Sequence, residues 1–271
     1  MISLDIKLIA LDLDGTLLDE DKKIPLETVG MIKEVMATGV IVTLVSARPV
    51  GSMLPYAKQL GLEALLISLS GAYITDMKQE RILLRRPVDL VKFRDMISIF
   101  EEKNFYIKVY YEEQLVVQEA TSETIEYSRI FGVPYKTVGS KGLRTLTQPP
   151  LRIYLCNEPV KIQEAAETLK GWTDYFHVIR DTDHGLEIVE RTVSKGSGLK
   201  AICQELNVPM SNVMAIGNEG SDISMIREAG LGIAMGNACA ELKQYAVDVT
   251  KTNTECGVGY AIQKYILNRS F

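Results

Sequence analysis

The chain lacks the features that mark several large classes of protein. Its 271 residues carry 30 Lys and Arg against 35 Asp and Glu, for a net charge of −5, and the basic residues are scattered along the sequence. Nucleic-acid-binding proteins usually concentrate basic residues on one surface, so this pattern argues against a nucleic-acid partner. The acidic balance also disfavours association with an anionic membrane surface.

Long apolar segments are also missing. No run of apolar residues approaches the roughly 20 residues that a transmembrane helix requires. The first residues, Met1 to Lys7, carry Asp5 within their apolar run and lack the basic start of a secretory signal peptide. We therefore expect a soluble protein with no membrane partner. The sequence gives no signal for a particular oligomeric state.

Cysteine is scarce, and its spacing does not indicate a disulfide framework or a metal site. The four cysteines form no C-x-x-C pair, and three of them lie in apolar stretches (Cys156, Cys203, Cys239 and Cys256). A free thiol in such a stretch usually acts as a small apolar side chain. Reduced cysteines fit a cytoplasmic protein, which is the location that we expect.

Both ends of the chain alternate short apolar runs with amphipathic segments, which is the pattern of βαβ units and a parallel sheet. The expected strands are 7–11, 40–45, 65–68, 213–216 and 232–235. The expected helices are 25–39, 49–60, 198–206, 222–229 and 258–267. The predicted fold class is α/β, with a Rossmann-like parallel sheet.

The middle of the chain has a different rhythm, typical of an α+β domain. A hairpin at 74–83 precedes it, residues 132–150 are rich in loop-forming residues, and strands are expected at 105–110, 115–118, 151–156, 176–178 and 186–189, with helices at 87–103, 122–131 and 160–169. We therefore predict a core formed by residues 1–83 and 190–271, with residues 84–189 inserted as a second domain.

Polar residues follow several of the expected core strands. In open α/β sheets, ligands bind beyond the carboxyl ends of the strands. Asp12 and Asp14 follow the first strand, and two carboxylates so close together favour a cation beside them. The other candidates are Ser46, Arg48, Ser70, the segment Asn218 to Asp222, and Lys195, where the chain returns to the core. Each motif alone has an ordinary explanation as a turn, a helix cap or a surface residue.

The motifs are more specific as an ordered set. They are Asp-Leu-Asp-Gly-Thr-Leu-Leu at 12–18, Ser-Ala-Arg at 46–48, Ser-Lys-Gly at 194–196 and Gly-Asn-Glu-Gly-Ser-Asp at 217–222. In this order they resemble the haloacid dehalogenase-like (HAD) hydrolase superfamily, and more narrowly the Cof-type sugar-phosphatase family with a C2B cap. The likeness spans nearly the whole chain. It implies a HAD-fold core with residues 84–189 as an α+β cap that selects the substrate.

The resemblance also implies a chemistry, hydrolysis of a phosphoric monoester. Asp12 would attack phosphorus and form an aspartyl-phosphate, while Asp14 would act as general acid and base. Lys195 would be the third catalytic residue and would offset negative charge. Mg²⁺ would be held by Asp12, Asp14 and Asn218, phosphate would be bound by Ser46, Ala47, Lys195 and Ser221, and supporting contacts would come from Ser70, Arg48 and Asp222.

Three positions depart from the family pattern. Asn218 and Ser221 replace the first Asp and the Asn of the usual acidic loop, and Ser70 replaces an Asn after the third strand. Losing one carboxylate should weaken magnesium binding, because hard cations favour carboxylates. We expect an active enzyme with weakened metal binding. A degenerate phosphate-binding or regulatory protein and a phosphomutase remain as alternatives.

The substrate is expected to be a small phosphorylated metabolite, with sugar phosphates as the class that the resemblance implies. Within the cap, His184 and Glu187 are the candidate substrate contacts, although His184 could equally be a solvated loop residue. Tyr106, Tyr110 and Tyr111 are expected to be strand residues that pack the cap sheet.

Overall fold

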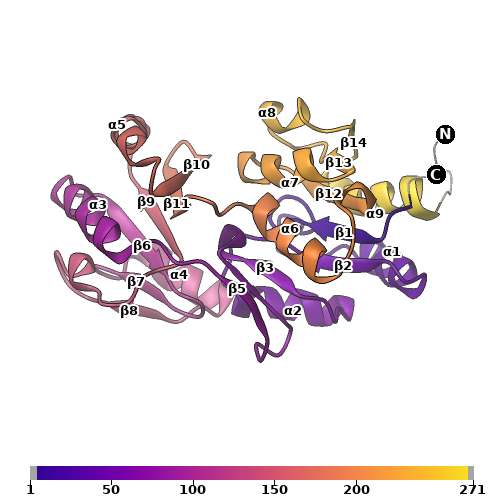
Figure 1. The fold of residues 1–271 in the computed structure, drawn as a ribbon, viewed down its shortest axis with the longest axis horizontal. Helices are drawn as coiled ribbons and strands as arrows, with labels where there is room; N and C mark the ends of the chain where they lie inside the picture. The colour runs from indigo at the N-terminus through magenta and orange to yellow at the C-terminus, as the bar shows by residue number, and fades with distance from the viewer. Residues whose placement is uncertain (1–4, 268–271) are drawn as a thin grey trace.

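The computed structural model describes residues 5–267 of the chain. Figure 1 shows two lobes side by side, each built around its own sheet, with both ends of the chain in the same lobe. That lobe is called the core below, and the other lobe, residues 88–190, is called the cap. No helix within residues 5–267 is both long and apolar enough to cross a lipid bilayer.

The core combines strands and helices from both ends of the chain. Its elements are β1 (Leu8–Leu11), α1 (Leu26–Ala37), β2 (Ile41–Leu44), α2 (Val50–Leu60), β3 (Leu66–Ser68), β4 (Tyr73–Thr75), β5 (Ile82–Arg85), α6 (Lys195–Glu205), β12 (Val213–Gly217), α7 (Ile223–Glu228), β13 (Leu231–Ala234), α8 (Ala240–Lys243), β14 (Asp248–Val249) and α9 (Gly257–Ile262).

A parallel five-stranded sheet, in the order β14-β13-β12-β1-β2, forms the centre of the core. All four residues of β1 are buried, as expected for a strand covered on both faces. Leu11 lies beside Leu44 of β2 and Ile216 of β12. Because the three strands are parallel and in register, the residues that follow them emerge at one edge of the sheet. Asp12 lies in the middle of that edge.

A second, antiparallel sheet of β3, β4 and β5 continues from the first. An isolated parallel bridge between Val45 and Ile67 links β2 to β3. The turn after β3, residues Leu69–Gly71, contains Ser70 with φ +57° and Gly71 with φ +101°. The chain leaves the core after β5 and returns to it before α6 (Figure 1).

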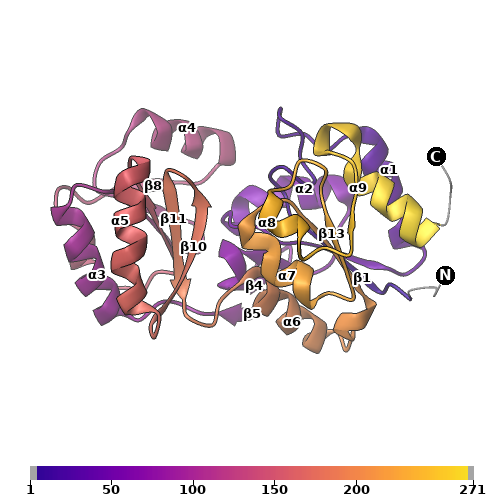
Figure 2. The ribbon, with the colours of Figure 1, turned by 90° about the horizontal axis from the view of Figure 1, so that it is seen from above.

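The cap is a six-stranded sheet, in the order β10-β11-β9-β6-β7-β8. Figure 2 shows α3 and α5 on the side of this sheet that faces away from the core, and α4 reaching toward the core. The cap elements are α3 (Leu90–Glu102), β6 (Tyr106–Tyr110), β7 (Leu115–Val117), α4 (Ser122–Phe131), β8 (Tyr135–Thr137), β9 (Arg152–Cys156), α5 (Pro159–Leu169), β10 (Phe176–Thr182) and β11 (Gly185–Glu190).

Side chains alternate between the two faces of the cap sheet, as the strand period of two requires. In β6 and β9, the residues that join the apolar cluster of the cap are Ile107, Val109, Ile153 and Leu155. The residues between them project from the opposite face. Register places Tyr110 beside Arg152, Lys108 beside Tyr154, and Tyr154 beside Glu187 of β11. The second face of the cap sheet is therefore polar and aromatic.

The predicted α/β class with a parallel core sheet is confirmed. Two short strands were missed. One is β8, which lies within the segment 132–150; all three of its residues are exposed, so it has no apolar alternation to reveal it. The other, β14, has two residues. The predicted helix at 198–206 begins earlier, at Lys195, because Ser194 caps it: the Ser194 hydroxyl accepts from Ser197 N, and the Ser197 hydroxyl accepts from Ser194 N.

Candidate active site

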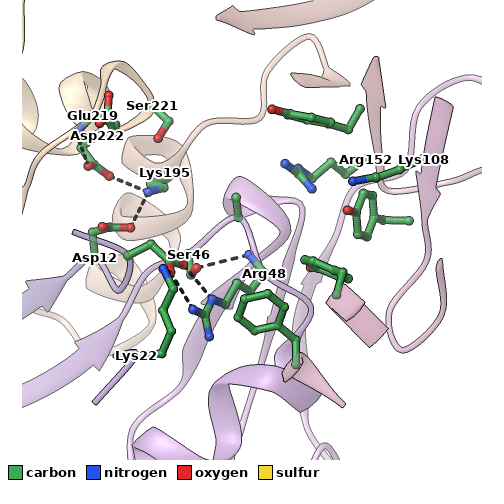
Figure 3. A pocket seen from close by; sticks show the side chains of 16 residues that line it. Asp12, Lys22, Ser46, Arg48, Lys108, Arg152, Lys195, Glu219, Ser221 and Asp222 are labelled. Carbon is green, nitrogen blue, oxygen red and sulfur yellow. Dashed lines mark hydrogen bonds and ion pairs between the residues drawn. The ribbon is translucent and has the colours of Figure 1, made fainter. Parts of the chain in front are cut away.

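A buried carboxylate–ammonium–carboxylate cluster lies at the carboxyl edge of the core sheet (Figure 3). Lys195 Nζ donates to Asp12 Oδ1 at 2.7 Å and to Asp222 Oδ1 at 2.5 Å. Asp12 follows β1, Asp222 precedes α7, and Lys195 is the first residue of α6. All three side chains are nearly inaccessible. Asp222 Oδ2 also accepts from the backbone N–H groups of Asn218 and Glu219, which fixes the loop after β12.

The charges in this cluster shift the pKa values of its members. Burial raises the pKa of Asp12 to about 7, the negative charge of Asp222 adds to that rise, and Lys195 opposes it. Burial acts to lower the pKa of Lys195, but the charges of Asp12 and Asp222 outweigh burial and raise it. Lys195 is therefore an ammonium ion at neutral pH, and it holds the two carboxylates in place.

Asp14 has a different environment, because cations surround it. Arg48 binds its carboxylate through two hydrogen bonds, from Nε at 2.7 Å and from Nη2 at 2.6 Å, and Lys22 Nζ donates at 2.8 Å. Burial would raise the pKa of Asp14, but the hydrogen bonds and charges of Arg48 and then Lys22 lower it overall. The Arg48 guanidinium also lies over the ring of Phe131 in α4, at 4.2 Å, and so joins the core to the cap.

Asn218 places its amide between two oxygens that could hold a cation. One amide atom lies 2.9 Å from the Asp14 carbonyl oxygen, 3.2 Å from Asp12 Oδ2 and 2.8 Å from Thr16 Oγ1. If this atom is nitrogen, it donates hydrogen bonds to all three. If it is oxygen, it accepts from Thr16 Oγ1. An amide can present either atom at the same position.

These distances test whether the residues suit Mg²⁺. Neighbouring ligands of an octahedral Mg²⁺ lie about 3 Å apart, because each is about 2.1 Å from the ion. The amide atom of Asn218 meets that spacing to both the Asp12 carboxylate and the Asp14 carbonyl. Within residues 5–267, no three His, Cys, Asp or Glu side chains form a metal-binding group. The fitting set is therefore one carboxylate, one backbone carbonyl and one amide.

Close backbone packing holds the returning chain against the core. A Cβ atom on Gly71 would lie 2.2 Å from the carbonyl oxygen of Ser194, next to Lys195. Ser70 donates its backbone N–H to the carbonyl of Ser46, and its buried hydroxyl has no partner among the residues described. Ser46 Oγ accepts from the backbone N–H of Arg48 at 3.2 Å. The segments that carry Ser46, Ser70 and Lys195 thus touch one another.

Replacing Gly71 by Ala should destabilise the protein by about 3 kcal/mol, because the added methyl group clashes with backbone and Gly71 has a positive φ. Gly30→Ala is the matched control. Gly30 lies in α1 with nothing within 4 Å of its added Cβ, so alanine should stabilise the helix by about 0.5–1 kcal/mol. Urea unfolding of both variants tests this prediction, and equal unfolding midpoints would contradict it.

A cavity of about 390 Å³ opens above these groups, between the core and the cap. Among the predicted phosphate-binding residues, Ser46, Ala47, Lys195 and Ser221 all line it. Arg48 also lines it, although the sequence suggested only a supporting position. Asn218 is buried beneath the cavity wall, and Ser70 is buried behind Ser46.

The cap supplies the opposite wall, which the sequence analysis missed. Figure 3 shows Lys108 and Arg152 across the cavity from Asp12. The cap side chains that line the cavity are Lys108, Tyr110, Tyr127, Phe131, Arg152 and Tyr154. Tyr110 was expected only to pack the sheet, yet it packs there and also lines the cavity. The alternation of polar or aromatic with apolar residues in Tyr-Ile-Lys-Val-Tyr and Arg-Ile-Tyr-Leu was the available signal.

The two predicted substrate contacts lie away from the cavity lining. His184 is exposed in the turn between β10 and β11 and lines a neighbouring hollow with Asn157 and Tyr106. Glu187 is buried and forms an ion pair with Arg152 at 2.9 Å, so it reaches the cavity only through Arg152. The structure therefore does not place His184 among the groups that surround Asp12, because the β10–β11 turn points to a different opening.

The chain is similar to known proteins over nearly its whole length. A family model described as haloacid dehalogenase-like hydrolase matches residues 9–262. Among curated proteins of Bacillus subtilis (strain 168), Stress response protein YhaX is 34% identical over 96% of this chain and 93% of its own length. Phosphatase YwpJ is 27% identical over 96% of this chain and 100% of its own. A solved haloacid dehalogenase-like hydrolase from B. subtilis superposes with a TM-score of 0.84 at 26% identity, covering 95% of this chain and 99% of that one.

Proposed function

The chain belongs to the haloacid dehalogenase-like hydrolase family, and on that premise we propose that it is a magnesium-dependent phosphatase of small phosphorylated metabolites, with sugar phosphates as the expected class. The observation that carries the proposal is the orientation of Asp12. Its Oδ1 is held by Lys195, and its Oδ2 lies 3.2 Å from the Asn218 amide atom, which also lies 2.9 Å from the Asp14 carbonyl oxygen. The name of the relative Phosphatase YwpJ supports the same activity.

The proposed reaction has two displacements at phosphorus. A carboxylate oxygen of Asp12 attacks the phosphorus of the ester, the bond to the leaving oxygen breaks, and that oxygen takes a proton from Asp14. Water then attacks the aspartyl-phosphate, Asp14 takes the proton of the water, and inorganic phosphate leaves while the Asp12 carboxylate is regenerated. Lys195 stabilises the negative charge that Asp12 and the phosphoryl group share.

Asp14 has two roles in this cycle: it donates a proton to the leaving group and accepts a proton from water. Its surroundings suit the second role better than the first. Its pKa is lowered by Arg48 and Lys22 after they overcome the effect of burial, so it is ionised at neutral pH and ready to accept a proton from water. Donating a proton to the leaving group requires that the ion pair with Arg48 loosen. A bound phosphate can draw Arg48 and Lys22 toward itself, since both line the cavity and an anion competes with the carboxylate for them.

Mg²⁺ would be held by the Asp12 carboxylate, the Asp14 carbonyl and the Asn218 amide oxygen. When bound, the cation supplies charge neutralisation for the phosphate oxygens. The side chains of Ser46 and Ser221 and the backbone at Ala47 would bind the phosphate with Lys195. Asp222 positions Lys195, Arg48 positions Asp14, and Ser70 supports the segment that carries Ser46.

We also propose that the inserted domain, predicted from the sequence as residues 84–189 and described above as the cap at 88–190, covers the site during reaction. The cap has its own apolar cluster, drawn from residues between Val88 and Ile188, and its polar face closes the cavity opposite Asp12. Such a cover excludes bulk water and contacts the leaving group, which gives it control over substrate choice.

The direct test of this proposal is phosphate release and its metal requirement. With millimolar Mg²⁺, we expect the purified protein to release phosphate from p-nitrophenyl phosphate and from hexose 6-phosphates. Excess EDTA should remove the activity, and added Mg²⁺ should restore it, because the proposed site contributes only one carboxylate and so binds Mg²⁺ reversibly. Appearance of free phosphate without any second hydroxyl acceptor would exclude a phosphomutase.

Two results would each overturn a part of this proposal. Binding of phosphate esters without turnover at any magnesium concentration would favour a phosphate-binding protein, which the departures at Asn218, Ser221 and Ser70 would then explain. Equal turnover in EDTA and in Mg²⁺ would refute the metal requirement but not the hydrolysis.

A further inference from the structure

The cavity has more positive charge on its cap wall than the proposed chemistry uses. Five cations line it, namely Lys22, Arg48, Lys108, Arg152 and Lys195. Four of them contact a carboxylate: Lys22 and Arg48 bind Asp14, Lys195 binds Asp12 and Asp222, and Arg152 binds Glu187. Lys108 has no carboxylate partner among the side chains that the structure describes. The rings of Tyr106, Tyr127 and Tyr154 each lie about 6 Å from its ammonium group.

Arg152 is buried and rigidly held, yet its hydrogen bonds are incomplete. Glu187 binds one end of the guanidinium, and the rings of Tyr110 and Tyr154 lie 4.7 and 5.2 Å from its central carbon. The Nε atom of Arg152 is buried with no partner among the residues described. A buried ion pair contributes little to stability because desolvation offsets its attraction. Stability therefore does not account for the Arg152–Glu187 pair. Because Arg152 lies in the wall of a cavity, we infer a role for it in ligand binding.

The local charge shows what kind of ligand would fit. The Arg152–Glu187 pair is neutral overall, so Lys108 leaves the cap wall with one uncompensated positive charge. Lys108 and Arg152 come from neighbouring antiparallel strands, β6 and β9, and project from the same face of the sheet. Figure 3 shows both side chains on the cap wall, opposite Asp12. An anion between them would gain charge-assisted contacts with the Lys108 ammonium and with the guanidinium of Arg152, both of which line the cavity.

We propose that Lys108 and Arg152 form a second anion site, and that the natural substrate is a phosphomonoester whose leaving group carries another anionic group, either a carboxylate or a second phosphate. This proposal rests on the proposed phosphatase activity and specifies its substrate. Asp12 and Lys195 engage the phosphate that is cleaved, while the second anion binds at the cap wall. The rings of Tyr110, Tyr127 and Tyr154 enclose the part of the ligand that lies between the two sites.

The test compares pairs of phosphate esters. The two members of a pair differ in the part of the leaving group that lies away from the cleaved phosphate, called the distant group, which is anionic in one member and neutral in the other. The first pair is glucose 1-phosphate and glucuronic acid 1-phosphate, which share the same ring and differ at C6, so that it tests a carboxylate. The second pair is fructose 6-phosphate and fructose 1,6-bisphosphate, which tests a second phosphate. We expect kcat/KM for the anionic member of at least one pair to exceed that of the neutral member by about tenfold or more. The pair that shows the preference identifies the second anion.

Variants of Lys108 then locate the preference. Lys108→Met should reduce the ratio of anionic to neutral kcat/KM by about tenfold, whereas Lys108→Arg should retain most of it, because arginine keeps the charge. Lys161→Met is the matched control, since Lys161 is an exposed lysine on α5, on the side of the cap away from the core. It should leave the ratio unchanged.

The possible failures are distinguishable. Phosphate release with ratios near one for both pairs would overturn the second anion site and leave the phosphatase standing. If Lys108→Met lowers kcat/KM equally for both members of a pair, the second anion site is also overturned. Such a result indicates a folding or general binding defect, which affects both esters alike. If no ester releases phosphate under any condition, the proposed function fails, and the substrate class fails with it.

Discussion

Asp12→Asn should lower kcat/KM for every hydrolysed ester by at least about a thousandfold. The substitution keeps the size of the side chain but removes a carboxylate oxygen, the group that we propose forms the bond to phosphorus. It also removes the charge that Lys195 contacts at 2.7 Å. Because Asp222 remains bound to Lys195, the ammonium keeps one buried partner, and the fold should survive. Steady-state phosphate release together with thermal unfolding measures both consequences.

The control for Asp12→Asn is Asp21→Asn. Asp21 lies in the same connection between β1 and α1, but its side chain is 78% exposed and forms an ion pair with Lys23. This variant makes the same change of charge near the site and should retain wild-type turnover. Activity in Asp12→Asn within tenfold of the wild type would rule out Asp12 as the nucleophile. A collapse of its melting temperature would instead make Asp12 a structural residue.

Asn218→Asp should destabilise the metal-free protein and strengthen its binding of Mg²⁺. Without metal, the substituted carboxylate would lie near Asp12 Oδ2 and the Asp14 carbonyl, and it could not donate the hydrogen bonds that the amide nitrogen offers them. The metal-free protein should therefore melt at a lower temperature. With Mg²⁺, the added carboxylate should lower the concentration for half-maximal activity by about tenfold. The rise in melting temperature on adding Mg²⁺ should be larger than in the wild type.

The melting measurement makes this test independent of turnover. Asn207→Asp serves as the control, because Asn207 is exposed just after α6 and has a positive φ that aspartate also tolerates. It adds the same charge far from the cavity lining and should alter neither the melting response nor the magnesium requirement. An unchanged magnesium dependence and an unchanged melting response in Asn218→Asp would show that position 218 does not bind the cation.

The core side of the site could be anticipated from the sequence, because strand ends determine it. Asp12 and the loop that begins at Asn218 follow β1 and β12, which are adjacent and parallel, so their side chains meet at one edge. The motif order then brought Lys195 into the same group. The bond between Arg48 and Asp14 could not be anticipated, since it depends on how far a long side chain bends back from the start of α2.

The cap side was not predictable in the same way. The alternation in β6 and β9 shows that these strands have two different faces, but it does not show what the second face meets. In the sequence, Tyr110 does not differ from an aromatic residue that only packs a sheet. Its place in the cavity wall becomes visible only when the position of the core relative to the cap is known. His184 was suggested by its position in a loop, and a loop position does not determine the direction in which a turn opens. Glu187 is close to Arg152 only because β9 and β11 pair side by side.

The position of β1 in its sheet also constrains when the site can form during synthesis. In the folded protein, β1 lies between β2, which follows it closely in the chain, and β12, which is about 200 residues later. Lys195 and Asn218 likewise come after the whole cap. A growing chain therefore completes the cap while one edge of β1 still lacks its final neighbour. Contacts of such long sequence separation slow folding. Here they make β1, the strand that Asp12 follows, the first core strand to be synthesised and one of the last to be fully paired.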